Sequence, residues 1–262
     1  MKLSISNIAW DAKNDQIVYD MMKKMNFVGL EIAPTKIFFN NPYDMCDAAK
    51  IWAAKLKMDY GFEISSMQSI WYGRNEKLFG TENERAMLVD YTKKAINFAQ
   101  AISCKNLVFG CPRNRNMNEG ADENIAINFF KEIGDFAAQF GIVIAMEANP
   151  PIYNTNYIND TASALELIKK VDSKGFLLNL DIGTMIANGE TISLLEGKEN
   201  LINHVHISEV GLKTIEKRNL HRQLARMLKK CGYEKFVSIE VGKQDDLKTI
   251  ENMMVYAKEI FS

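Results

Sequence analysis

The sequence predicts a single-domain α/β protein, a (β/α)8 TIM barrel that spans residues 1–262. Short β-rich segments alternate eight times with longer amphipathic segments, and such alternation implies a parallel sheet. No glycine-, serine- or proline-rich linker divides the 262 residues, a length that suits one barrel. The alternative, a doubly wound open sheet, usually carries a phosphate-binding glycine loop, and the sequence contains neither GxGxxG nor GxxxxGK[ST].

The predicted strands are rich in β-branched and aromatic residues. In chain order they are residues 2–10, 27–33, 62–70, 106–111, 142–147, 176–181, 201–208 and 236–241. Between them, segments such as 121–140 and 245–261 repeat apolar residues every three or four positions, which is typical of the core-facing side of a helix. Gly141 and Gly232 suit the position after a helix, and Asp160 with Thr161 suits a helix start.

The composition indicates an ordinary soluble protein with a core: 47% of residues are hydrophobic, 25% are charged and the net charge is −1. No basic block favours nucleic acid, and no apolar run approaches a membrane span. The first residues lack a signal-peptide pattern, and the four cysteines form no CxxC pair. We therefore expect a cytoplasmic protein that binds a small molecule, with neither nucleic acid nor a membrane as partner. A homo-oligomer is compatible with this expectation.

Four chemically active residues lie at the ends of four successive predicted strands. They are Glu147, Asp181, His206 and Glu240. In a TIM barrel, the C-terminal strand ends form the active face. Because side chains alternate along a strand, each of the four shares a face with a small or polar residue, while apolar residues take the other face. We therefore expect all four to point into one barrel mouth.

Three carboxylates that converge in a buried mouth repel one another, and unpaired buried charge is costly. One divalent cation would offset this repulsion. Three oxygen ligands and one imidazole nitrogen, with positions left open, suit Mn²⁺, Mg²⁺ or Co²⁺, and Zn²⁺ is a further candidate. The predicted metal ligands are Glu147, Asp181, His206 and Glu240. Pairing with nearby Lys or Arg is the alternative explanation for each acid taken singly.

Two of the chain's three histidines stand one residue apart in the segment HVH. Strand alternation places His204 and His206 on the same, inward face. His206 lies nearer the rim, level with the acids, and is the predicted ligand as a neutral imidazole. His204 lies one layer deeper, where we expect it to hydrogen-bond beneath the site.

At these residues the chain resembles the sugar phosphate isomerase/epimerase family of xylose isomerase-like TIM barrels. The matching segments are NLVFGCPRNR (106–115), MEANPPIYN (146–154), LDIGT (180–184), HVHISE (204–209) and CGYEKFVSIEVG (231–242). The resemblance extends over essentially the whole chain. It implies a barrel in which Glu147, Asp181, His206 and Glu240 bind one divalent metal, and an activity on carbohydrate.

Two positions depart from the epimerases of this family. Thr184 stands where they usually carry a substrate-contacting histidine, and the segment GLK (211–213) stands where they tend to carry an arginine. The resemblance therefore does not specify ketose 3-epimerase activity. The nuclease branch of the family uses three zinc ions and several more histidines, which a chain with three histidines does not supply.

The predicted chemistry is isomerisation or epimerisation of a sugar, sugar phosphate or sugar acid through a metal-stabilised enediolate. Glu147 and Glu240 are the predicted catalytic base and acid. Two alternatives remain open. Loss of a β-hydroxyl from the same enediolate would make the protein a dehydratase, and a barrel without turnover would only bind a sugar.

Strands one to four supply the other half of the mouth. The predicted substrate-binding residues are Asn7, Gln68, Trp71, Arg113 and His221, with Trp10, Glu31 and Arg115 also placed to meet substrate. Arginine forks suit phosphate or carboxylate, which suggests an anionic sugar, with a solvated loop residue as the alternative for Arg115. Trp10 and Trp71 either stack on a sugar or wall the pocket. His221 begins the helix after the seventh strand and either reaches the mouth or lies on the helix surface. Cys111 is interpreted as a packing residue.

Overall fold

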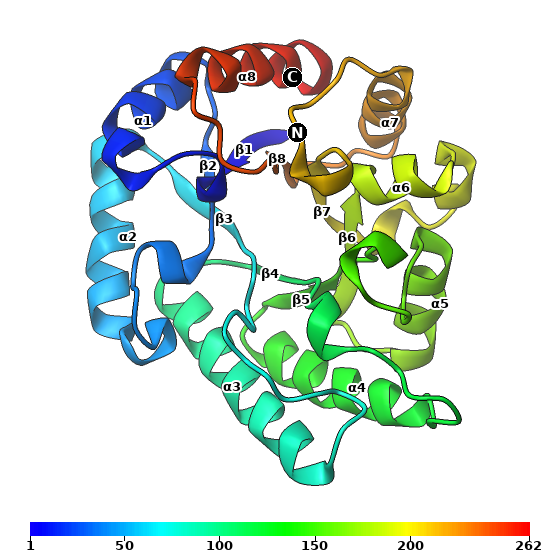
Figure 1. The fold of residues 1–262 in the computed structure, drawn as a ribbon. Coiled ribbons are helices and arrows are strands. Elements are labelled where there is room, and N and C mark those ends of the chain that lie inside the picture. The colour runs from blue at the N-terminus through cyan, green and yellow to red at the C-terminus, as the bar shows by residue number, and fades with distance from the viewer.

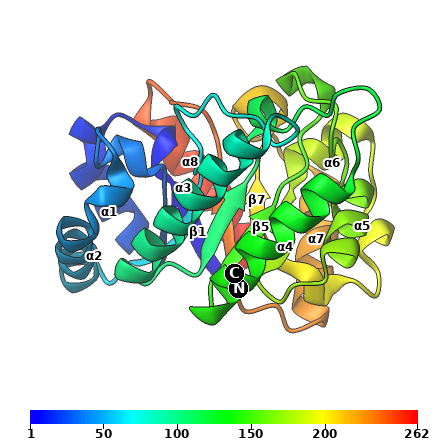
Figure 2. The same cartoon turned by 90° about the horizontal axis from the view of Figure 1, so that it is seen from below.

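The computed structural model describes residues 1–262 and confirms the predicted barrel. Eight parallel strands follow one another in sequence order around a closed barrel, and β8 pairs with β1 to complete it. The helices form a ring outside the strands (Figure 1). The two ends of the chain lie together at one end of the barrel (Figure 2). None of the helices is both long and apolar enough to cross a membrane.

The strands of the barrel are short. They are β1 (Lys2–Ser6), β2 (Gly29–Ile32), β3 (Glu63–Met67), β4 (Asn106–Phe109), β5 (Val143–Met146), β6 (Phe176–Asp181), β7 (Ile202–Ile207) and β8 (Phe236–Ile239). Several end earlier than the sequence predicts. At the rim the chain turns, and side chains take over the backbone hydrogen bonds that the strands would otherwise form. Asn7 Oδ1, just past β1, accepts a hydrogen bond from the Ala33 amide at 2.9 Å.

The eight main helices follow the strands in strict alternation. They are α1 (Asp15–Lys24), α2 (Cys46–Tyr60), α3 (Glu82–Ala101), α4 (Asn124–Gln139), α5 (Thr161–Val171), α6 (Ile182–Asn188), α7 (Asn219–Lys230) and α8 (Leu247–Phe261). The predicted helix ends are confirmed. Asp160 caps α5 by accepting from the Ser163 amide at 2.7 Å, and Gly141 and Gly232 have φ of 62° and 71° after α4 and α7.

The core lies between the strands and the helix ring, where apolar residues of both are buried. Close packing at two glycines fixes the entry to β6. A Cβ atom at Gly175, just before β6, would lie 2.0 Å from the carbonyl oxygen of Gly134 in α4. Only glycine allows this approach, which seats the strand that carries Asp181 against its helix.

Candidate active site

The four predicted ligands converge at the C-terminal end of the barrel. Glu147 directly follows β5, Asp181 ends β6, His206 lies near the end of β7 and Glu240 directly follows β8. One ligand atom from each lies within 4.8 Å of the others. Asp181 and His206 are direct partners in the β6–β7 ladder, so adjacent strands place them side by side. Strand alternation therefore brings the four together as the sequence predicts.

Two asparagine side chains hold the Glu147 carboxylate. Asn179 Nδ2 donates to Oε1 at 2.7 Å, and Asn149 Nδ2 donates to Oε2 at 3.1 Å. Gly110 leaves the space that this carboxylate needs, because a Cβ atom there would lie 2.8 Å from Oε2. Both oxygens of Glu147 therefore have fixed directions, as a ligand or catalytic base requires.

Asp181 serves both as the last residue of β6 and as the cap of α6. Its Oδ2 accepts from the Thr184 amide at 2.8 Å, and its Oδ1 accepts from the Ser208 hydroxyl. Thr184 Oγ1 lies 2.9 Å from Asp181 Oδ2 and 2.7 Å from the Ala148 carbonyl. The threonine hydroxyl is thus used inside the protein.

The Nδ1 atom of His206 is the point at which the site converges. It lies 2.9 Å from Glu147 Oε1 and 3.2 Å from Glu240 Oε2. The other oxygen of Glu240, Oε1, accepts a hydrogen bond from Gln68 Nε2 at 3.1 Å. Gln68 therefore lies in the mouth as predicted, and it orients a predicted catalytic carboxylate.

Burial and nearby charges shift the pKa values of three of the four predicted ligands, Asp181, His206 and Glu240. Burial, reinforced by Glu147, raises the pKa of Asp181, and burial raises the pKa of Glu240 to about 7 although His206 opposes it. Burial disfavours the charged form of His206, but Glu240 and Glu31 outweigh it and raise its pKa well above the ordinary value. A divalent cation would neutralise the same charges, and the donor set suits one. The residues present therefore fit the predicted metal.

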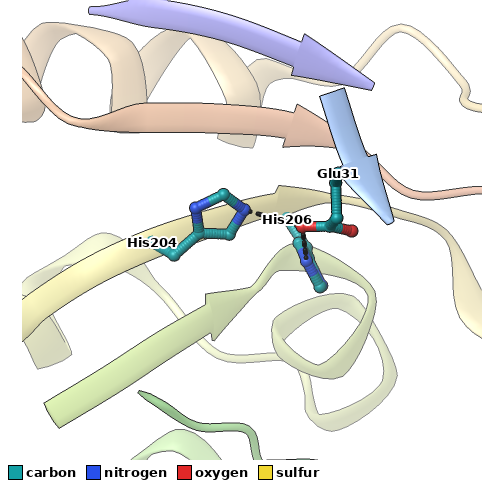
Figure 3. A group of neighbouring side chains, drawn as sticks. All are labelled: Glu31, His204 and His206. Carbon is teal, nitrogen blue, oxygen red and sulfur yellow. Dashed lines mark hydrogen bonds and ion pairs between the residues drawn. The ribbon is translucent and has the colours of Figure 1, made fainter. Parts of the chain in front are cut away.

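A second layer lies beneath the mouth, where Glu31 of β2 meets both histidines of β7. Its Oε2 lies 2.9 Å from His204 Nε2 and 3.0 Å from His206 Nε2 (Figure 3). Burial alone would raise the pKa of Glu31, but His206 and His204 outweigh it and lower the pKa to about 2. His204 thus hydrogen-bonds below the site as expected. Glu31 does not reach substrate space.

A cavity of about 170 Å³ opens above the four ligands. It is lined by Gln68, Ser69, Val108, Gly110, Cys111, Pro112, Glu147, Asn149, Tyr153, Asp181, Ser208, Glu209, Leu212 and Glu240. Four of these residues are acidic and none is lysine or arginine. Burial raises the pKa of Cys111 to about 12, so its thiol stays protonated and it serves packing.

A larger cavity, of about 720 Å³, opens at the opposite end of the barrel, among Lys2, Lys57 and Lys235. His204 lies at its inner end. We place the active site at the smaller cavity because the carboxylates and the imidazole converge there, and because TIM-barrel active sites lie at the C-terminal strand ends.

Several residues predicted to bind substrate lie elsewhere. Trp71 is 2% exposed, donates to Thr92 Oγ1 at 2.8 Å and packs against Phe109, so it belongs to the core between the barrel and α3. Trp10 is likewise buried and donates to Asp15 at 2.7 Å. These two predictions are corrected because the strands end early and the chain turns both rings outward from the mouth.

The predicted polar contacts need the same correction. Asn7 is engaged with the Ala33 amide, and Arg113 is exposed on its loop; neither lines the mouth cavity. His221 is fully buried between α7 and α8, where its Nδ1 lies 3.0 Å from Tyr256 Oη. Of the five predicted substrate-binding residues, only Gln68 lines the mouth.

Arg115 is neither a substrate-binding residue nor a solvated loop residue, the two roles that the sequence suggested. Its guanidinium is fully buried and donates to the carbonyls of Gly110, Glu147, Tyr157 and Ile158, and to Asn149 Oδ1. Burial lowers its pKa to about 10, so it remains a cation at neutral pH. It joins the loops that follow β4 and β5 and orients the asparagine that holds Glu147.

Asn149, Ser208 and Tyr153 are among the mouth residues that the sequence argument missed. Asn149 and Ser208 each follow a predicted ligand by two positions, so the same strand alternation could have found them. Tyr153 left no such signal. It lies in the loop after β5, and its hydroxyl accepts from the Gly211 amide at 2.9 Å, which joins two loops over the mouth.

The burial of His221 predicts a pH effect on stability. Burial lowers its pKa from 6.5 to about 4, and its Nε2 has no partner. Between pH 6.5 and pH 4 the unfolded chain therefore binds the proton more tightly, and this group removes about 3 kcal/mol of stability as pH falls. Urea unfolding across that range should show the loss in the wild type and a shallower pH dependence in His221→Gln. Equal pH slopes would contradict the assignment.

The closed barrel with a carboxylate–histidine cluster at its strand ends defines the class: a TIM barrel with a candidate metal centre. The family described as xylose isomerase-like TIM barrel matches residues 19–259, and the chain belongs to this family. None of the curated proteins compared with the chain matches it in sequence.

Solved structures share the fold at low sequence identity. One is a 3-keto-D-glucoside 4-epimerase, YcjR, from E. coli, with 18% identity, a TM-score of 0.78 and 99% of each chain covered. Another is a D-psicose 3-epimerase solved in the presence of D-fructose, with 16% identity, a TM-score of 0.80, and 100% of this chain and 99% of that one covered. A third is the IOLI protein with a binding zinc atom, with 17% identity, a TM-score of 0.73 and coverage of 99% and 96%.

Proposed function

We propose that the protein is a divalent-metal-dependent isomerase or epimerase that acts on a neutral sugar. One observation carries the proposal: three carboxylates and one imidazole from β5 to β8 converge in a closed barrel mouth. The sugar epimerases among the similar structures support it at the level of fold.

The residues of the mouth divide the chemistry between them. A divalent cation bound by the four ligands would polarise a substrate carbonyl and acidify the neighbouring C–H. Glu147 and Glu240 are then the groups that remove and return the proton, a role typically worth about 10² to 10⁴ in rate. Separate donors orient them: Asn149 and Asn179 hold Glu147, and Gln68 holds Glu240.

The fate of the proton decides the reaction. Return to the opposite face of the same carbon gives epimerisation, and return to the neighbouring carbon gives aldose–ketose isomerisation. Loss of a β-hydroxyl from the same enediolate would give dehydration.

The charge of the mouth favours a neutral substrate. The lining residues include four acids and no lysine or arginine; Arg218 pairs with Glu209, and the other three carboxylates exceed the charge of one divalent cation. Neither arginine that suggested an anionic sugar lines the cavity, and Arg115 already donates to five acceptors within the protein. A phosphate placed there would meet carboxylates without a compensating cation of the protein.

Proton exchange tests the proposal. The protein with Mn²⁺ in D₂O is given neutral ketoses and aldoses and, in parallel, their phosphates. We expect deuterium at the carbon next to the carbonyl of a neutral sugar, with at least about tenfold faster exchange than for its phosphate, because like charges repel in the mouth. Faster exchange of the phosphates would contradict the neutral class. Release of water would indicate a dehydratase, and no exchange across the panel would leave only a sugar-binding barrel.

A further inference from the structure

We propose that Glu31 is a positioning residue that, together with His204, fixes which nitrogen His206 presents to the mouth. The inference rests on the proposed function, since it concerns the metal ligand of the same site. Glu31 and His206 are 0% exposed and His204 is 1% exposed, so no solvent competes for their contacts. Figure 3 shows dashed lines from one oxygen of the Glu31 carboxylate to a nitrogen of each imidazole.

The chemistry of the carboxylate sets the tautomer. An ionised carboxylate only accepts hydrogen bonds, so each imidazole contact to Glu31 Oε2 requires a proton on the histidine Nε2. Neutral His206 then carries its lone pair on Nδ1. That atom faces Glu147 Oε1 at 2.9 Å and Glu240 Oε2 at 3.2 Å, in the mouth. Glu31 thus selects the tautomer in which a cation can be bound from above.

His204 holds the Glu31 carboxylate in place through a second hydrogen bond to Oε2. It donates to the same oxygen as His206, and the two rings lie nearly perpendicular, with centroids 5.3 Å apart. The Glu31 oxygen is thereby kept in line with His206 Nε2. A carboxylate that backs a histidine ligand fixes its ring and raises its basicity.

Only one of the two Glu31 oxygens has hydrogen-bond partners. Glu31 Oε1 is buried without any hydrogen-bond partner, and an unsatisfied buried acceptor costs about 1–3 kcal/mol. No lysine or arginine pairs with Glu31; its two contacts are to histidines. The contacts of Glu31 are thus confined to the two imidazole rings, as a positioning role for His206 requires.

Metal affinity and nitrogen protonation test the inference directly. Mn²⁺ binding is measured by titration calorimetry for the wild type, Glu31→Gln and Glu31→Met. We expect the Kd to rise about 10–100-fold in Glu31→Met, the range typical for loss of a partner behind a metal ligand, and less in Glu31→Gln, which keeps an acceptor oxygen. If Glu31→Met does not fold, Glu31→Gln decides. Unchanged affinity in the folded variant overturns the inference.

The matched control is Ser4→Ala. Ser4 is also fully buried on the barrel interior, but it bonds Ser65 at 2.5 Å and Ser238 at 3.3 Å and does not contact His206. The Kd of the Ser4→Ala variant for Mn²⁺ should stay within about twofold of the wild-type value, although a buried hydrogen bond is lost. An equal loss of affinity in Ser4→Ala would mean that general loosening of the barrel, and not Glu31, sets the Kd, which overturns the inference.

The tautomer itself is visible by ¹⁵N NMR of the histidine side chains. With only three histidines in the chain, the Zn²⁺-loaded protein should give one metal-bound imidazole that is protonated at Nε2. Protonation of that ring at Nδ1, or binding of two Zn²⁺ per chain with Glu31 and His204 as ligands of the second, would overturn the inference. Failure of the wild type to bind any divalent metal would instead contradict the proposed function.

Discussion

Replacing Glu240 with glutamine should lower proton exchange at the substrate carbon by about 10³-fold or more, while the barrel stays folded. Glutamine cannot accept the proton as a base does, and positioned bases contribute about 10²–10⁴ in rate. The variant also removes one charge from the ligand set. The fold should tolerate the change, because burial, which raises the pKa of Glu240 to about 7, disfavours a charged carboxylate more than a neutral amide.

Deuterium incorporation with Mn²⁺ measures this effect, and circular dichroism with urea unfolding checks the fold. The control is Glu63→Gln at the opposite end of the barrel, where Glu63 pairs only with the exposed Lys2 at 2.9 Å. Its exchange rate should match the wild type. Full exchange in Glu240→Gln would overturn the assignment of Glu240.

Replacing Arg115 with methionine should destabilise the protein by about 3–5 kcal/mol, because several buried acceptors lose their donor and each unsatisfied one costs about 1–3 kcal/mol, not fully additively. Four backbone carbonyls and Asn149 Oδ1 would lose their donor inside the protein. Arg115→Lys should recover only part of the loss, because an ammonium lacks the planar fork that reaches several acceptors at once. Urea unfolding measures the difference.

Arg113→Met is the control for this effect. Arg113 stands two positions earlier in the same loop and is exposed, and such surface changes usually alter the unfolding free energy by less than about 0.5 kcal/mol. If Arg115→Met proved as stable as Arg113→Met, the buried guanidinium would have no structural role. The sequence favours Arg113 as the functional arginine, whereas burial in the structure singles out Arg115.

The fold could be predicted because its signals are local and repeated. Each strand–helix unit carries its own apolar period, and the caps at Asp160, Gly141 and Gly232 mark helix ends that the structure confirms. Strand ends at the rim were less predictable. Residues such as Trp10 and Trp71 continue an apolar run, yet they lie after the ladder ends, where loop geometry decides their direction.

In the candidate site, too, the residues on strands could be predicted and those in loops or at helix starts could not. The convergence of Glu147, Asp181, His206 and Glu240 could be predicted because strand alternation and position along the strand fix where a side chain points. Arg113 and His221 were misplaced because they lie in a loop and at a helix start, where no such periodicity applies. Glu31 was assigned to the mouth although it lies below it, since depth along a strand depends on the stagger between strands, which the sequence does not reveal.

Anomalous diffraction from crystals of the wild type grown with Mn²⁺ tests the central claim most directly. We predict one strong anomalous peak per chain, within bonding distance of Glu147, Asp181, His206 Nδ1 and Glu240. A peak on the other side of the ring, at His206 Nε2 with Glu31 and His204, or no peak in the barrel, would contradict the account.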